Sequence, residues 1–92
     1  MKLTILGFDV LPMLLPILIK AAKEVVDLFV KGEELNDEMR GIVRMGYAAA
    51  VEFRDNIVKD PDNTLTDEAI DEFKALCEDT AEEGGFSLVI GA

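Results

Sequence analysis

The sequence predicts a mainly α-helical protein: a three-helix bundle with short extended N- and C-terminal segments, forming one small helical domain over residues 1–92. Three stretches carry apolar residues at helical spacing, and each has a residue typical of a helix boundary at its start or end. The chain has 92 residues, of which 50% are hydrophobic, which is enough for one core and too few for two domains.

The first predicted helix begins within the run Val10–Ile19 (VLPMLLPILI), which holds eight large apolar residues and two prolines. Proline is tolerated in the first turn of a helix, where the backbone N–H has no intrahelical partner. We therefore expect the prolines to start the helix, either near Met13, with Pro16 in the first turn, or at Pro12, where Pro16 would lose one hydrogen bond and kink the helix. Gly32 is expected to end it. Its apolar stripe, opposite a charged face, comprises Leu18, Ala22, Val25 and Phe29.

The second predicted helix starts at Asn36, a favourable N-cap, and ends before Pro61, whose ring disfavours helix at the preceding residue. Its middle, Met45–Val51 (MGYAAAV), carries no charge, which is typical of a helix buried on more than one side. Glycine and alanine at positions 46 and 48–50 permit close approach of neighbouring backbones. We expect this helix to be the central one.

The third predicted helix starts after Thr66 as N-cap and ends at Gly84–Gly85. Its inner stripe comprises Ala69, Ile70, Phe73, Leu76, Cys77 and Ala81. Two short extended segments remain, Leu3–Phe8 and Phe86–Ile90. They are expected either to pair with each other as strands or to dock elsewhere.

The stretch Leu65–Leu76 (LTDEAIDEFKAL) resembles the entering helix of a calmodulin-type EF-hand. A calcium loop after it would begin at Asp79 and would need glutamate at its twelfth position, where this chain has Ile90. A loop from Asp60 would have Leu65 where glycine is needed. The resemblance therefore stops at the helix, and we expect neither a metal nor any other cofactor.

No catalytic residues are predicted. The chain has no histidine, the usual general base near neutral pH. Cys77 falls on an apolar stripe, where an inert buried thiol is expected, and the sequence offers no histidine to activate Ser87. Acid–base catalysis by carboxylates needs a pocket that pushes their pKa values apart, which a solvated acidic face does not provide. We therefore expect that this protein is not an enzyme.

The formal net charge is -10, and it is unevenly distributed. Residues 1–31 hold four lysines against three acidic residues, whereas the remaining 61 residues hold five basic and sixteen acidic residues. Such a surface repels phosphate backbones and anionic lipids, so direct nucleic-acid binding is not expected and membrane binding is disfavoured. Three arginines of the second helix are expected to pair with nearby acids: Arg40, Arg44 and Arg54.

Four carboxylates crowd the last turns of the third helix, where the helix dipole disfavours negative charge: Glu78, Asp79, Glu82 and Glu83. One interpretation is a solvated acidic end that aids solubility. The other is an acidic docking face for a basic partner.

The apolar run Val10–Ile19 is half the length that a membrane-spanning helix needs, roughly 20 residues, and it lacks the features of a clean signal peptide. Its surplus leucines would form an apolar patch of a kind that soluble monomers rarely expose. We expect this patch and the C-terminal apolar residues to contact another copy or a different subunit. The predicted interface comprises Leu11, Leu14, Leu15, Phe86, Leu88 and Ile90.

These observations favour a non-enzymatic helical structural or interaction protein, a small oligomer-forming subunit of a larger assembly. A virus or phage particle (a virion component) is one example, and the expected location is the cytoplasm or the assembled particle. The first alternative is an acidic regulator or inhibitor that binds a basic surface of a nucleic-acid-handling protein. The second is a membrane-associated small protein anchored at the interface by Val10–Ile19.

Overall fold

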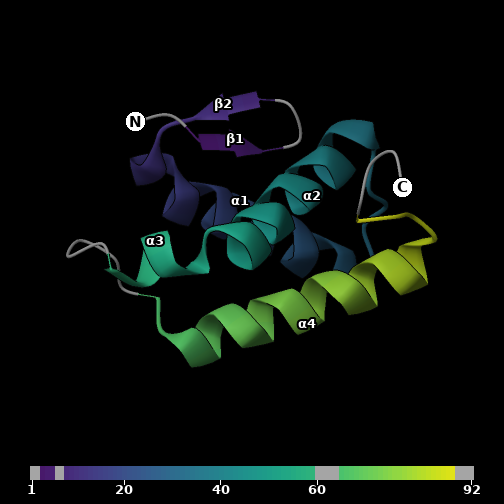
Figure 1. Cartoon of the computed structure of the whole chain (residues 1–92). Coiled ribbons are helices and arrows are strands. Elements are labelled where there is room, and N and C mark those ends of the chain that lie inside the picture. The colour runs from purple at the N-terminus through teal and green to yellow at the C-terminus, as the bar shows by residue number, and fades with distance from the viewer. Residues whose placement is uncertain (1–2, 6–7, 60–64, 89–92) are drawn as a thin grey trace.

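The computed structural model describes residues 3–5, 8–59 and 65–88, and this part of the chain is mainly helical, as predicted (Figure 1). The elements in chain order are β1 (Leu3–Ile5), β2 (Phe8–Val10), the 3-10 helix η1 (Pro12–Leu14), α1 (Leu15–Val30), α2 (Asp37–Glu52), α3 (Arg54–Lys59) and α4 (Asp67–Gly84).

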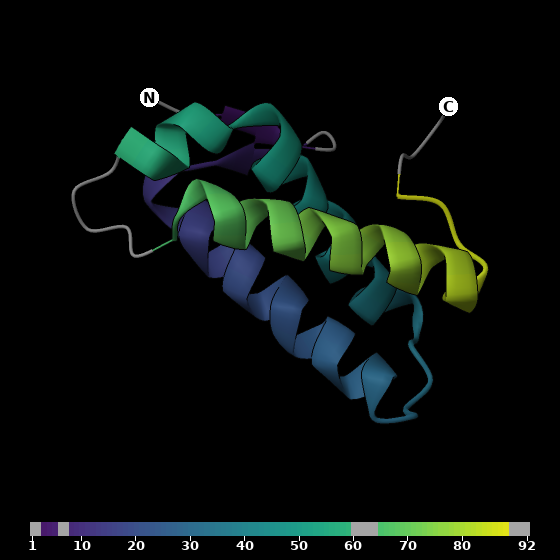
Figure 2. The ribbon, with the colours of Figure 1, turned by 90° about the horizontal axis from the view of Figure 1, so that it is seen from below.

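Three long helices, α1, α2 and α4, contact one another pairwise and enclose the core. The β1–β2 hairpin and α4 lie on opposite sides of the α1–α2 pair (Figures 1 and 2). The most completely buried large side chains come from all three long helices and from α3: Leu15, Ile19, Val26, Val43, Ile57, Ile70 and Cys77.

The prolines of the apolar run start the first helix, as predicted. Pro12 opens η1, and Pro16 lies in the first turn of α1, where its missing N–H costs no hydrogen bond. Gly32, at φ 100°, follows the end of the helix. The buried face is centred slightly away from the predicted stripe, because Leu18 and Phe29 are only half-buried. The fully covered positions of α1 are Leu15, Ile19, Ala22, Val25 and Val26.

The second predicted helix is interrupted. It starts at the Asn36 cap, whose Oδ1 accepts a hydrogen bond from the Met39 N–H at 2.9 Å, but α2 ends at Glu52. Phe53 leaves the helical conformation at φ -123° and ψ 27°, and the short helix α3 follows. No proline or glycine stands at this break. The contact that favours it is tertiary, because the Arg54 guanidinium reaches two carboxylates of α4.

The uncharged middle of α2, Met45–Val51, is buried only in part, because Val51 is 48% exposed. α2 contacts α1, α3, α4 and β1. Ala49 and Ala50 are fully buried, and Gly46 packs directly on α1. A side chain at Gly46 would collide with the Ala22 Cβ and would lie 3.0 Å from the Leu18 carbonyl oxygen. Glycine is therefore required at this helix crossing.

Both ends of α4 agree with the sequence analysis. The Thr66 Oγ1 accepts a hydrogen bond from the Ala69 N–H at 3.1 Å, and Gly85 adopts the left-handed conformation at φ 69°. The inner stripe is correct except at its edges, since Leu76 is exposed and Ala69 is only half-buried. Thr80, which was not on the predicted stripe, is buried.

The N-terminal extended segment forms a hairpin with itself. β1 and β2 pair antiparallel, with Leu3 opposite Val10 and Ile5 opposite Phe8. Phe86 and Ser87 belong to no strand, so in the described part of the chain the two terminal segments do not pair with each other. The rest of the predicted C-terminal extended segment, residues 89–90, lies outside the described residues.

Candidate functional site

A cluster of large apolar side chains is exposed where η1 passes into α1. We call it the N-terminal apolar patch, and it comprises Leu11 (44% exposed), Met13 (68%), Leu14 (38%) and Ile17 (57%). α1 turns Leu15 into the core, and Ile17, two residues later, therefore lies on the opposite side of the helix. Four large apolar residues within seven positions remain open to solvent.

This patch agrees only in part with the predicted interface. Leu11 and Leu14 are exposed as expected, but Leu15 is fully buried in the core and is not available to a partner. Met13 and Ile17 were not predicted as interface residues, although both precede the charged stretch from Lys20 onward. Each of them lies two positions from Leu15 in the chain. Because Leu15 faces the core, this spacing indicates that both side chains face solvent.

The C-terminal half of the predicted interface lies elsewhere. Phe86 and Leu88 are half-buried and pack against the core of their own chain, and Ile90 lies outside the described residues. Phe86 lines the same pocket as Phe29, which is near the end of α1, about 22 Å of helix rise from Leu14. Figure 1 places the start of α1 and the segment after α4 at opposite ends of the molecule. The two sets of residues therefore do not form one continuous surface on this chain, and their contact with other subunits stays a prediction.

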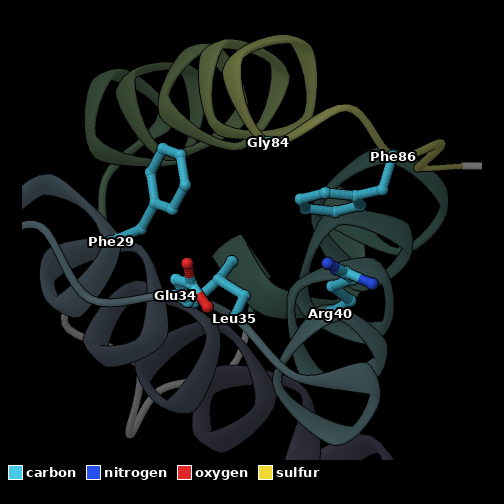
Figure 3. A pocket seen from close by; sticks show the side chains of 6 residues that line it. All are labelled: Phe29, Glu34, Leu35, Arg40, Gly84 and Phe86. Carbon is cyan, nitrogen blue, oxygen red and sulfur yellow. The ribbon is translucent and has the colours of Figure 1, made fainter.

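A pocket of about 330 Å³ opens at this second end of the molecule (Figure 3). Five segments meet there: the end of α1, the α1–α2 connection, the first turn of α2, the end of α4 and the residues after α4. The lining residues are Phe29, Glu34, Leu35, Arg40, Gly84 and Phe86.

Two arginines of α2 hold the Phe86 ring in place. The guanidinium carbons of Arg40 and Arg44 lie 5.8 Å and 5.5 Å from the ring centroid, within cation–π range. The Arg44 Nε–H donates to the Ser87 carbonyl oxygen at 2.6 Å. Arg44 thus binds the segment after α4 and not an acid, contrary to the prediction, whereas Arg40 pairs with Asp37 at 3.3 Å.

The four predicted docking carboxylates are all exposed on α4: Glu78, Asp79, Glu82 and Glu83. They continue a longer acidic face, because Asp67, Glu68, Asp71 and Glu72 occupy the same side of the helix two and three turns earlier. Among the described residues, the hydrogen-bond and ion-pair partners of this face lie along the edge toward α2 and α3. Arg54 pairs there with Asp67 at 3.0 Å and with Asp71 at 2.5 Å.

The third contact on that edge joins α4 to Tyr47, whose hydroxyl donates to the Glu78 Oε2 at 3.2 Å. Burial and the neighbouring Glu78 carboxylate both raise the pKa of Tyr47 above its usual value. The phenol therefore stays protonated and serves as a donor. Within the described part of the chain, five carboxylates of the face have no ion-pair partner: Glu68, Glu72, Asp79, Glu82 and Glu83.

Cys77 is fully buried, as predicted, and burial raises the pKa of its thiol to about 12, with a smaller contribution from Glu78. The thiolate is the reactive form, so this shift from 9.0 lowers its fraction at pH 8 about a thousandfold. We expect the native thiol to be alkylated at least about a hundredfold more slowly than the thiol of the unfolded chain. A mass-spectrometric time course with iodoacetamide, with and without guanidinium chloride, measures this ratio. Equal rates would contradict the buried position.

Among the described residues, no group of three or more metal-ligating side chains comes together. No helix in the same residues is long and apolar enough to cross a bilayer. Comparison of the chain with protein-family models, with curated proteins and with solved structures finds no match. Function is therefore inferred from the geometry of these surfaces.

Proposed function

We propose that this chain is a non-enzymatic interaction subunit of a larger assembly and that it docks onto other protein subunits through the N-terminal apolar patch. The observation that carries the proposal is the exposure of Leu11, Met13, Leu14 and Ile17 together at the start of α1. Contiguous apolar surface on a folded protein is characteristic of interaction sites, because leaving it in water forfeits the free energy of burial.

Charge favours a second copy of the chain as one such subunit. Residues 1–31, which include the patch, carry nearly balanced charge, whereas most of the acidic residues follow later. Two patches therefore approach each other with little repulsion, while contact between two acidic α4 faces would bring like charges together. A different subunit would bind the same patch through the same residues. Measuring the self-association of the purified chain distinguishes this case from binding of a second copy.

Changing Met13 and Ile17 together to serine is expected to weaken self-association or partner binding at least tenfold. Burying one large apolar side chain contributes about 1.5–3 kcal/mol, so losing two such side chains weakens association by more than tenfold. Helical content should not change, because both side chains are exposed. Sedimentation velocity over a concentration series, with circular dichroism on the same samples, measures both quantities.

Val30→Ser is the matched control, because Val30 is 71% exposed at the other end of the same helix. It should associate like the parent. The proposal is contradicted if the parent remains monomeric at the highest attainable concentration and the double variant retains the same proteins from a native extract as the parent. Flotation with liposomes distinguishes an interfacial membrane anchor, which would use the same side chains.

A second candidate function is binding of a basic protein surface by α4, as an acidic regulator would do. The unpartnered carboxylates Glu68, Glu72, Asp79, Glu82 and Glu83 favour it, since the helix itself supplies no compensating base in its last turn. Binding through these residues should weaken steeply as salt rises, whereas docking through the N-terminal apolar patch should change little.

A further inference from the structure

The pocket between the ends of α1 and α4 combines an apolar cleft with two opposite charges. We propose that it binds a small zwitterion with an apolar body, of the class of free aromatic and large aliphatic α-amino acids. The site is at the opposite end of α1 from the N-terminal apolar patch, so the proposal is independent of the docking function.

The apolar part of the pocket is formed by two phenyl rings. Phe29 and Phe86 lie on opposite sides of the opening, with Leu35 below them (Figure 3). Gly84 makes this arrangement possible, because a Cβ there would lie 3.0 Å from the Phe86 ring and 3.7 Å from the Phe29 ring. The missing side chain leaves room for a flat or branched apolar group between the rings.

The polar part of the pocket is formed by Arg40 and Glu34. The Arg40 Nε is buried and is the one buried side-chain polar atom in the described part of the chain that has no hydrogen-bond partner in the protein. Protein atoms cover the Nε, so a ligand carboxylate would accept charge-assisted hydrogen bonds from the terminal nitrogens of the same guanidinium.

Glu34 lines the same pocket, and no ion pair joins it to Arg40. Arg40 pairs instead with the exposed Asp37 at 3.3 Å, and the two opposite charges that line one pocket match a ligand that carries both signs. Glu34 would accept the ligand ammonium while Arg40 holds the carboxylate.

The pocket wall is fixed before any ligand arrives. The Phe86 N–H donates to the Ala81 carbonyl oxygen at 3.0 Å, closing the end of α4, and Arg44 holds Ser87. Preorganisation of this kind lowers the entropic cost of binding. A cavity of about 330 Å³ is near the lower limit for ligand pockets, so it accommodates one small molecule.

Net charge selects a zwitterion over a simple anion. The chain carries a formal charge of -10, which repels an anion at long range even though Arg40 would attract it locally. An amino acid adds no net charge and avoids this repulsion.

The test is a titration of the ¹⁵N-labelled full chain with L-phenylalanine, followed by two-dimensional NMR. We expect saturable shifts confined to the pocket residues, with a dissociation constant in the millimolar range. Arg40→Met keeps the aliphatic stem and removes the guanidinium, and it should weaken binding at least about tenfold. Lys23→Gln is the matched control, since it makes the same change in net charge on exposed α1 surface away from the pocket. It should bind like the parent.

Ligand variants test the same contacts without changing the protein. Phenylalaninamide lacks the carboxylate. N-acetylphenylalanine lacks the ammonium and resembles the C-terminal residue of a peptide. Both should bind at least about tenfold more weakly than phenylalanine. Glu34→Gln should reduce the preference for phenylalanine over N-acetylphenylalanine. If Arg40→Met does not fold, Arg40→Lys, which keeps the charge but lacks the planar pair of terminal donors, replaces it.

Absence of saturable shifts with the parent protein would overturn the proposal. Equal affinity of the parent and Arg40→Met would overturn it as well, because the carboxylate contact would then be wrong. Equal affinity for phenylalanine and for either of its two derivatives would show that the site does not recognise a zwitterion.

Discussion

Replacing Ala49 with lysine is expected to unfold most of the protein or to lower its melting temperature by roughly 15–30 °C. Ala49 is fully buried in the uncharged middle of α2, so the new ammonium would enter the core without a carboxylate partner. Burying an unpaired charge costs about 4 kcal/mol or more, which approaches the whole stability of about 5–15 kcal/mol of a small domain. Thermal unfolding followed by circular dichroism measures the loss, with a shift of about 4–8 °C expected for each kcal/mol.

Val51→Lys is the matched control for this change. It introduces the same side chain two positions later in the same helix, where Val51 is 48% exposed. We expect it to change the free energy of unfolding by no more than about 0.5 kcal/mol. If Ala49→Lys and Val51→Lys both melt like the parent, the middle of α2 is not part of the core.

The boundaries of the helices could be predicted because their causes are local. Asn36 and Thr66 each accept a hydrogen bond from an N–H three residues later, and Gly85 adopts a left-handed conformation that other residues resist. These effects depend on a few neighbouring residues and not on the rest of the fold. The start of α1 at the proline-containing run has the same local origin.

The break at Phe53 could not be predicted, because its cause is not local. The residues around it have no proline or glycine, and the contact that favours the break joins Arg54 to Asp67 and Asp71, more than a dozen residues away. A helical pattern in the sequence continues through Phe53 and Ile57, and only the packing of α4 distinguishes one helix from two.

The candidate sites, like the helices, could be predicted only in part. Hydrophobicity identified Leu11 and Phe86 as apolar residues beyond the regular stripes, but it does not tell whether such a residue contacts its own chain or a partner. Phe86 packs against Arg40 and Arg44, more than 40 residues earlier, and so becomes part of a pocket. From the sequence, these arginines were expected to pair with acids, so the pocket was not predicted.

Gly46→Ala is expected to destabilise the protein by about 1–3 kcal/mol, although alanine is the better helix former. Taken alone, the exchange of glycine for alanine within a helix stabilises by about 1 kcal/mol. At Gly46 the added methyl group collides with the Ala22 Cβ, lies 3.0 Å from the Leu18 carbonyl oxygen and 3.1 Å from the Phe73 ring. Backbone cannot yield as a flexible side chain can, so α1 and α2 must move apart and lose contacts along their length.

Two further variants separate the collision from the helix propensity. Gly41→Ala makes the same exchange in the same helix, where nothing lies within 4 Å of the added methyl group. It should therefore stabilise the protein by up to about 1 kcal/mol. Ala22→Gly in the Gly46→Ala background moves the methyl group from one helix to the other and should restore part of the lost stability, with a coupling energy above about 0.5 kcal/mol. If the two changes are additive, Ala22 and Gly46 do not meet. Urea unfolding of the four proteins in the cycle, with Gly41→Ala measured beside them, decides whether the close approach of α1 and α2 is the reason for glycine at this position.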